Sequence, residues 1–237
     1  MLRFLAHARH EFLKVVDTRP LAAPVHIIIG NEVRAHDSRR LHAPACTQQH
    51  RTPGTSGAMR LPHVQAADAD SVISAVSHAW AAQCDDALQR PVTSTMPPTL
   101  HTPIISCKRV DFVLRREASL LLQQCIHEEA VRTIAGSSGV PTAMLTMQQL
   151  SAELLFVDDL LAHTALLRLL AEKRLLRITL VDHNKLTGEL ATAGLGDCVA
   201  DIVDHHQDMG AHTVCDAARA HSQLPLSHVS VFCASIF

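Results

Sequence analysis

Short apolar runs rich in β-branched residues recur along the chain, and stretches with helical periodicity separate them. Such runs are typical of strands buried in a parallel sheet, and we expect strands at Val25–Ile29, Pro103–Ser106, Leu154–Val157, Arg177–Val181 and Val199–Val203. Apolar spacings of three and four residues predict helices at Leu2–Val16, Val72–Ala82, Asp111–Cys125 and Leu160–Lys173. Alternating strands and helices predict an α/β fold, a parallel sheet with right-handed crossovers and helices on both faces.

The segment from Val33 to Gln65 interrupts this alternation. It is polar, rich in Arg, His, Pro, Gly, Ser and Thr, and has no apolar period, so we expect it to be disordered. It is either a surface insertion or an unspliced intron read in frame, because Val codons begin with GT and a Gln codon can end in AG. The helix that follows has Asp70 or Ser71 as its expected N-cap.

The composition is that of a globular protein, with 47% hydrophobic and 19% charged residues in 237. The net charge of −2 argues against a broad basic surface, so we expect neither a nucleic-acid nor a membrane partner. Seven cysteines without a CxxC pair favour reduced thiols in a cytoplasmic protein. The amphipathic, basic stretch Met1–Val16 leaves a mitochondrial presequence as the alternative.

Acidic and imidazole side chains follow two of the expected strands. Asp182 and His183 come after one strand, and Asp204, His205 and His206 come after the next. Either group alone is equally compatible with a solvated strand end, because Asp and His are common in loops. Together they predict a metal site, because the carboxyl ends of parallel strands meet at one edge of the sheet.

Carboxylates dominate the groups expected at this edge, and imidazole and amide groups supplement them. This mixture suits Mn²⁺ or Mg²⁺ better than a structural zinc, which prefers thiolates. Several carboxylates can also bridge two divalent ions about 3.5–4 Å apart, which clamp the two oxygens of a phosphoryl displacement. The expected members are Asn31, Asp68, Asp70, Asp182, Asp204, His205 and His206.

Three motifs in order carry a family resemblance. With residues 33–65 removed, GNE at Gly30–Glu32 runs into DADS at Asp68–Ser71; LVDHN at Leu180–Asn184 and IVDHH at Ile202–His206 follow. The chain resembles the DHH phosphoesterase superfamily, and within it the exopolyphosphatase/prune group. Weaker matches lie at Phe4–His7, Thr102–Ile105, Leu114–Glu117 and Leu155–Leu160. A competing register, GNEVRAHDS, uses Asp37 but has Ala35 where the first acid belongs, so we prefer Asp68 and Asp70.

The resemblance implies hydrolysis of terminal phosphate from inorganic polyphosphate, or of another small phosphoanhydride, by a water that two ions activate. By the same resemblance, Asp68 and Asp182 hold one ion with Asn31 beside it. Asp70, Asp182 and His205 hold the other, so Asp182 bridges both. The resemblance also makes His206 a ligand of the substrate phosphate and implies that Asp204 orients the imidazoles.

Two further expectations concern residues outside these motifs. Arg115 and Arg116 are either phosphate ligands, through the bidentate geometry of their guanidinium groups, or part of a solvated helix face. His183 and Asp208 have no assigned role and are expected at the surface. The expected catalytic residues are therefore Asp182, His205 and His206.

The group also has a fourth motif that ends in an aspartate and a second, C-terminal domain. We expect both to lie beyond the end of this chain, whose apolar stretch Val229–Phe237 resembles a segment inside the first domain. Alternative functions are therefore another DHH phosphoesterase activity, on pyrophosphate or a cyclic nucleotide, and an inactive truncated prune-like fragment.

Overall fold

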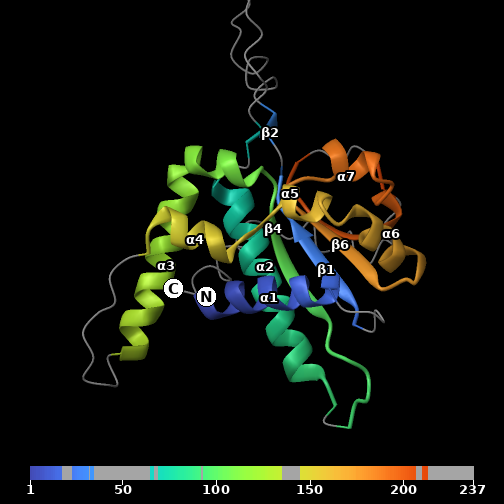
Figure 1. Ribbon diagram of the computed structural model, residues 1–237, viewed down its shortest axis with the longest axis horizontal. Coiled ribbons are helices and arrows are strands. Elements are labelled where there is room, and N and C mark those ends of the chain that lie inside the picture. Colours follow the sequence, from blue (N-terminus) through green and yellow to red (C-terminus); the bar gives the residue numbers. More distant parts are fainter. Residues whose placement is uncertain are drawn as a thin grey trace, which may run out of the picture.

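A five-stranded parallel sheet forms the centre of the computed structural model, with strand order β5-β4-β1-β6-β7. The structure describes residues 1–17, 23–31, 33–34, 65–66, 69–91, 93–134, 145–206 and 210–212. Figure 1 shows the sheet between two groups of helices, which confirms the α/β fold expected from the alternating pattern. The strands of this sheet are β1 (Val25–Ile29), β4 (Leu100–Ile105), β5 (Leu155–Phe156), β6 (Leu176–Val181) and β7 (Val199–Val203).

The helices are α1 (Leu2–Asp17), α2 (Ala69–Gln89), α3 (Arg116–Ile134), α4 (Met147–Glu153), α5 (Val157–Leu161), α6 (Thr164–Glu172) and α7 (Gly188–Thr192). Two short 3-10 helices, η1 (Arg109–Leu114) and η2 (Gly196–Cys198), precede α3 and β7. None of the helices within the described residues is both long and apolar enough to span a bilayer.

Strand β1 is buried on both faces, as its uninterrupted apolar run predicts. Ile27 and Ile29 belong to a core cluster with leucines of α6 and α7, whereas Ile28 packs with Ala75 and Ala79 of α2. Helices therefore cover both faces of the sheet, with α2 on one face and α6 and α7 on the other (Figure 1).

The strand order places a switch point between β1 and β6. The connections from β1 to β4 and from β4 to β5 step in one direction, and those from β5 to β6 and from β6 to β7 run in the other. Because parallel crossovers are right-handed, loops that leave β1 and β6 turn toward opposite faces and open a crevice at the carboxyl ends. Asn31 and Asp182 each lie two residues beyond the paired residues Ile29 and Leu180, at this crevice.

Two of the expected helices are interrupted. The helix expected at Asp111–Cys125 is divided, because η1 ends at Leu114 and α3 begins only at Arg116. The helix expected at Leu160–Lys173 is likewise two helices, since α5 ends at Leu161 and α6 begins at Thr164. Neither break has a proline or glycine that would mark it in the sequence.

Three boundaries also differ from expectation. Asp70 and Ser71 lie inside α2, which begins at Ala69, so the N-cap expected at either residue is wrong. The strand expected at Leu154–Val157 contains only Leu155–Phe156. Asp159 accepts a hydrogen bond from the Phe156 backbone amide at 2.8 Å and fixes the first turn of α5. Strand β4 is longer than expected at its amino end.

The two ends of the interrupting segment lie together. Strands β2 (Val33–Arg34) and β3 (Gln65–Ala66) form a two-stranded antiparallel ladder, in which Val33 pairs with Ala66. The chain therefore leaves and re-enters the domain at one place, as an insertion would. The disorder expected for residues 33–65 concerns mainly residues 35–64, which lie outside the described residues, as do residues 229–237.

Candidate metal centre

Four side chains from the ends of β6 and β7 form a compact cluster: Asp182, Asp204, His205 and His206. One donor atom from each lies within 4.8 Å of all the others. The two aspartates are buried and the two histidines are exposed, so the cluster is anchored in the domain and open to solvent on one side. These four residues come from two of the three predicted motifs.

Asp182 occupies an unusual backbone conformation directly after β6. Its φ of 64° lies in the left-handed region, which costs an L-residue on the order of 1–2 kcal/mol and which Asp tolerates better than most. Its amide donates to Val203 O at 2.8 Å, and its Oδ2 accepts from the Ser71 hydroxyl at 2.6 Å. These two bonds hold the strained conformation and turn Oδ1 toward the histidines.

The contact between Ser71 and Asp182 requires a glycine at position 30. A Cβ added to Gly30 would lie 2.4 Å from the backbone oxygen of Ser71, a distance that real Cβ atoms do not adopt. Only glycine therefore lets the first turn of α2 approach the end of β1 this closely. The glycine of the GNE motif thus has a structural role, because it allows α2 to approach the cluster.

Both oxygens of Asp204 are engaged by neighbouring side chains. Oδ1 accepts from the His206 backbone amide at 3.1 Å and from Nδ1 of its ring at 2.6 Å. Oδ2 accepts from the Asn184 side-chain amide at 2.7 Å. Because Nδ1 of His206 donates to Asp204, its Nε2 is the ring nitrogen left for a ligand. The hydrogen bond to Asp204 raises the pKa of His206, and the nearby charges of Asp182 and Asp70 act in the same direction.

The cluster fits a divalent cation by its donors and their spacing. Asp182 Oδ1 lies 3.4 Å from His205 Nδ1 and 3.9 Å from His206 Nδ1. Two ligands that each lie about 2.1 Å from one ion are separated by about 3–4 Å, so His205 and Asp182 are spaced as ligands of a shared ion. Carboxylate donors suit Mg²⁺ or Mn²⁺ and imidazole donors suit other first-row metal ions, so the identity of the ion stays a prediction.

Three other expected ligands come from the first motif. Asp70 lies in the first turn of α2 and accepts a hydrogen bond from the Ser71 amide at 2.9 Å; its charge acts on His206, but it is not one of the four clustered residues. Asn31 follows β1, and its carbonyl oxygen accepts from Ser106 Oγ at 2.6 Å. Asp68 lies outside the described residues. The ligand set with two ions therefore stays a prediction.

The two arginines proposed as phosphate ligands lie at the break between η1 and α3. Arg116 is exposed and Arg115 is partly buried. In the part of the chain that the structure describes, neither makes a hydrogen bond or ion pair with the four clustered residues. Their role as phosphate ligands stays a prediction.

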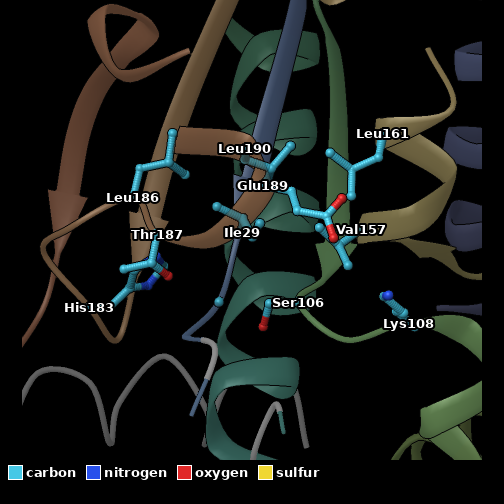
Figure 2. Close-up of a pocket in the computed structure, with 11 residues that line it drawn as sticks. Ile29, Ser106, Lys108, Val157, Leu161, His183, Leu186, Thr187, Glu189 and Leu190 are labelled. Atoms are coloured by element: carbon cyan, nitrogen blue, oxygen red, sulfur yellow. The ribbon is translucent and has the colours of Figure 1, made fainter. Parts of the chain in front are cut away.

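A small pocket lies beside the cluster, in the same crevice. Figure 2 shows it between the end of β1, the loop after β4 and the segment from His183 to α7. Its cavity volume is about 20 Å³. Its wall is mixed: aliphatic side chains line one part, and polar groups line the rest, namely Ser106, Lys108, His183, Thr187 and Glu189.

His183 is not the surface residue that we expected. Its Nδ1 donates to Val181 O at 2.9 Å, and the residue is half-buried and lines the pocket. Burial lowers its pKa, so the ring is neutral at pH 7. Asp208, the other residue expected at the surface, lies outside the described residues.

Ser71 and Asn184 are the contributors that sequence reasoning missed. Both stand inside quoted motifs, DADS and LVDHN, but the motifs drew attention to their acids and imidazoles. Ser71 donates to Asp182, and Asn184 donates to Asp204. The sequence signal that could have identified them is a polar residue at a fixed position in each motif.

No protein-family model matches the chain, and no curated protein matches its sequence. The resemblance to the DHH phosphoesterases therefore rests on the motifs alone and stays a prediction.

Proposed function

We propose that the chain is a divalent-metal-dependent phosphohydrolase whose substrate is inorganic polyphosphate. The observation that supports this most is the cluster of two carboxylates and two imidazoles at the carboxyl ends of β6 and β7, beside the switch point of the sheet, with donor atoms within 4.8 Å. Open α/β sheets bind their ligands at this position. The order of motifs, each after its strand, supports the choice of phosphoanhydride chemistry.

Bound divalent ions would neutralise the phosphoryl oxygens and lower the pKa of a water to near neutrality. The residues of the chain prepare that site. Ser71 and the Val203 carbonyl fix Asp182, so that its Oδ1 faces His205 Nδ1. These two atoms would be ligands of one ion. Burial of Asp182 and Asp204 keeps both carboxylates in place before an ion arrives.

His206 suits a ligand of the substrate phosphate better than a ligand of the metal. Its Nδ1 is used by Asp204, and the raised pKa favours the charged imidazolium. An imidazolium donates to a phosphate oxygen through Nε2, whereas a metal ligand must be neutral. The side chain is half exposed, so a phosphate can reach it.

The pocket favours a second candidate function, hydrolysis of a phosphate joined to a small organic group. Aliphatic side chains contribute nothing to binding an all-anionic chain such as polyphosphate. Lys108 and Glu189 also balance each other in charge at this pocket. With a volume of about 20 Å³ the pocket does not enclose an organic group, so an organic phosphate would place its phosphate at the cluster and rest its uncharged group against the aliphatic side chains at the pocket's mouth.

Phosphate release from inorganic polyphosphate and from an organic phosphate, with Mg²⁺ or Mn²⁺, tests both candidates. The informative variant is His205→Ala, and the matched control is His10→Ala, an exposed histidine on α1. We expect the wild type and the control to release phosphate and His205→Ala to lose at least 100-fold of the rate. Release that is equal in all three proteins, or absent from all three, would contradict the proposal and favour an inactive fragment.

A further inference from the structure

Asp204 is the one member of the four-residue cluster whose two carboxylate oxygens both accept from described side chains of the protein. The Asn184 amide reaches Oδ2 at 2.7 Å, and the His206 ring reaches Oδ1 at 2.6 Å. Asn184 and Asp204 are both buried, with exposed fractions of 6% and 9%. A buried side-chain amide therefore lies directly behind the aspartate that orients an exposed histidine.

We propose that Asn184 is a positioning residue, which holds Asp204 in the one orientation that keeps the His206 Nδ1–H bonded to Asp204 and directs Nε2 outward. The imidazolium keeps this orientation, and the neutral ring is then the Nδ1–H tautomer. The consequence of this positioning for catalysis rests on the proposed function, in which His206 contacts the substrate phosphate. The orientation of the His206 ring does not depend on the proposed function.

The reason lies in the freedom of an aspartate side chain. The terminal torsion of Asp is broad and roughly two-fold, so a carboxylate held on one oxygen only can turn the other away. With Oδ2 fixed by Asn184, Oδ1 is held toward His206 and accepts from both its backbone amide and its ring. The two ring nitrogens then have different roles, because Nδ1 donates to Asp204 and Nε2 faces the ligand.

Asn184 also carries this orientation from one strand to the next. It lies in the loop after β6, whereas Asp204 and His206 follow β7. The bond from the Asp182 amide to Val203 O joins the same two strand ends. The Asp182 backbone thus connects the end of β6 to the end of β7, and the Asn184 side chain connects the loop after β6 to the loop that carries both histidines.

The amide is suited to this position because it donates without adding charge. An aspartate at 184 would place a second carboxylate against Asp204, where like charges repel. An alanine would leave a buried carboxylate oxygen without its donor, and burial of an unpaired charged group is costly. Asn184→Ala is therefore the informative change.

Nitrogen-15 NMR of the His206 ring in the metal-free full chain tests the tautomer without reference to activity. At a pH where the ring is neutral, we expect wild type to show the Nδ1–H tautomer and Asn184→Ala to show a mixture with Nε2–H. Lys185→Ala, an exposed neighbour on the same loop, should match wild type. An unchanged tautomer in Asn184→Ala would overturn the proposal. An Nε2–H ring in wild type would also overturn the proposal, and this result does not depend on whether any variant folds.

Kinetics with polyphosphate and Mn²⁺ then give the catalytic consequence. We expect kcat/KM of Asn184→Ala to fall about 10- to 100-fold, as for other residues that orient ligands, with Mn²⁺ affinity changed less than about twofold. Equal kcat/KM in the two proteins would contradict the catalytic role. If wild type releases no phosphate but the NMR result is as expected, the proposed function fails and the positioning role stands.

Discussion

Ser71 and Gly30 show how two small residues prepare the cluster around Asp182. Ser71 is fully buried and its hydroxyl donates at 2.6 Å to Asp182, whose backbone is in the left-handed conformation. Gly30 permits this contact by leaving room for the first turn of α2. At the residue scale, metal affinity and stability should therefore depend on side chains that touch no ligand.

Ser71→Ala should weaken Mn²⁺ binding about 10- to 100-fold, because Asp182 Oδ2 loses its donor and the carboxylate can turn away from His205. Isothermal titration calorimetry measures this. The matched control is Ser119→Ala, a buried serine on α3 whose hydroxyl has no partner within the described residues. Equal weakening in both variants would show that the effect comes from packing and not from the bond to Asp182.

Gly30→Ala should lower the free energy of unfolding by about 1–3 kcal/mol, because its Cβ would overlap the Ser71 backbone. Urea denaturation measures the change. Gly196→Ala is the control, since a Cβ there meets only His212 Cε1, at an ordinary 3.7 Å. A Gly30→Ala protein as stable as the control would contradict the close approach of α2 to β1.

At the element scale, a row of polar side chains crosses the sheet on the side that α2 covers. His26 of β1 contacts His101 Nδ1 at 3.0 Å with one ring nitrogen and Thr179 Oγ1 at 2.7 Å with the other. Burial lowers the pKa of His26 to about 3, and the neighbouring His101 adds to this. Both rings are therefore held neutral inside the sheet at pH 7.

Acid should destabilise the fold through His26. Its folded pKa of about 3 lies below the ordinary value of 6.5, so the unfolded chain binds more protons between these values. Stability is complete above about pH 6.5 and falls by about 1.4 kcal/mol per pH unit below it. Urea denaturation from pH 7.5 to pH 5 should show this slope in wild type and a shallower one in His26→Gln. Parallel profiles for the two proteins would contradict the prediction.

Arg109 joins η1 to the segment around β5. Its guanidinium donates to the Ser151 carbonyl, to Leu154 O at 3.1 Å and to Asp159 Oδ2 at 2.6 Å, and it lies 4.5 Å from the centre of the Phe156 ring. Lysine cannot make these bonds together. The elements η1, α4, β5 and α5 therefore depend on one side chain.

Arg109→Lys should cost about 1.5–3 kcal/mol, the value of hydrogen bonds to a charged group. Thermal denaturation measures the loss, with Arg116→Lys at an exposed site as the control. A melting temperature as high as that of the control would show that these elements hold together without the guanidinium.

The strands could be predicted from the sequence better than the helices. Val25–Ile29 matches β1, because continuous burial on both faces produces a nearly continuous apolar run. Val199–Val203 matches β7, although three of its five residues are only partly buried at the edge of the sheet. The breaks at Arg115 and between Leu161 and Thr164 could not be predicted, because no proline or glycine marks either one. Likewise the acids and imidazoles of the cluster were predictable from strand ends, whereas the donors to Asp182 and Asp204 depend on side-chain orientation.

At the scale of the whole molecule, the ladder between β2 and β3 makes residues 33–65 removable. Val33 and Ala66 are paired, so joining Glu32 to Ala66 closes a short gap and restores an unbroken first motif. Removing the long connection also removes the entropy cost of closing it. We expect the shortened chain to keep its far-UV circular dichroism and to melt no earlier than the full chain.

A shortened chain that no longer folds would contradict the interpretation of this segment as an insertion.

Within the full chain, Asp70→Ala and Asp37→Ala distinguish the two registers of the first motif. We expect only Asp70→Ala to weaken Mn²⁺ binding, because Asp70 acts on His206 from the first turn of α2. The opposite result would favour the register through Asp37.

The central claim is that Asp182 and His205 hold a divalent cation at the carboxyl ends of β6 and β7, beside the switch point of the sheet. Titration of the full chain with Mn²⁺, followed by electron paramagnetic resonance of the free ion, tests it directly against Asp182→Asn. Asparagine tolerates the left-handed backbone nearly as well, so the variant changes the charge and spares the fold. We predict saturable binding by wild type and at least tenfold weaker binding by the variant. The absence of saturable binding, or equal binding by both proteins, would contradict the claim.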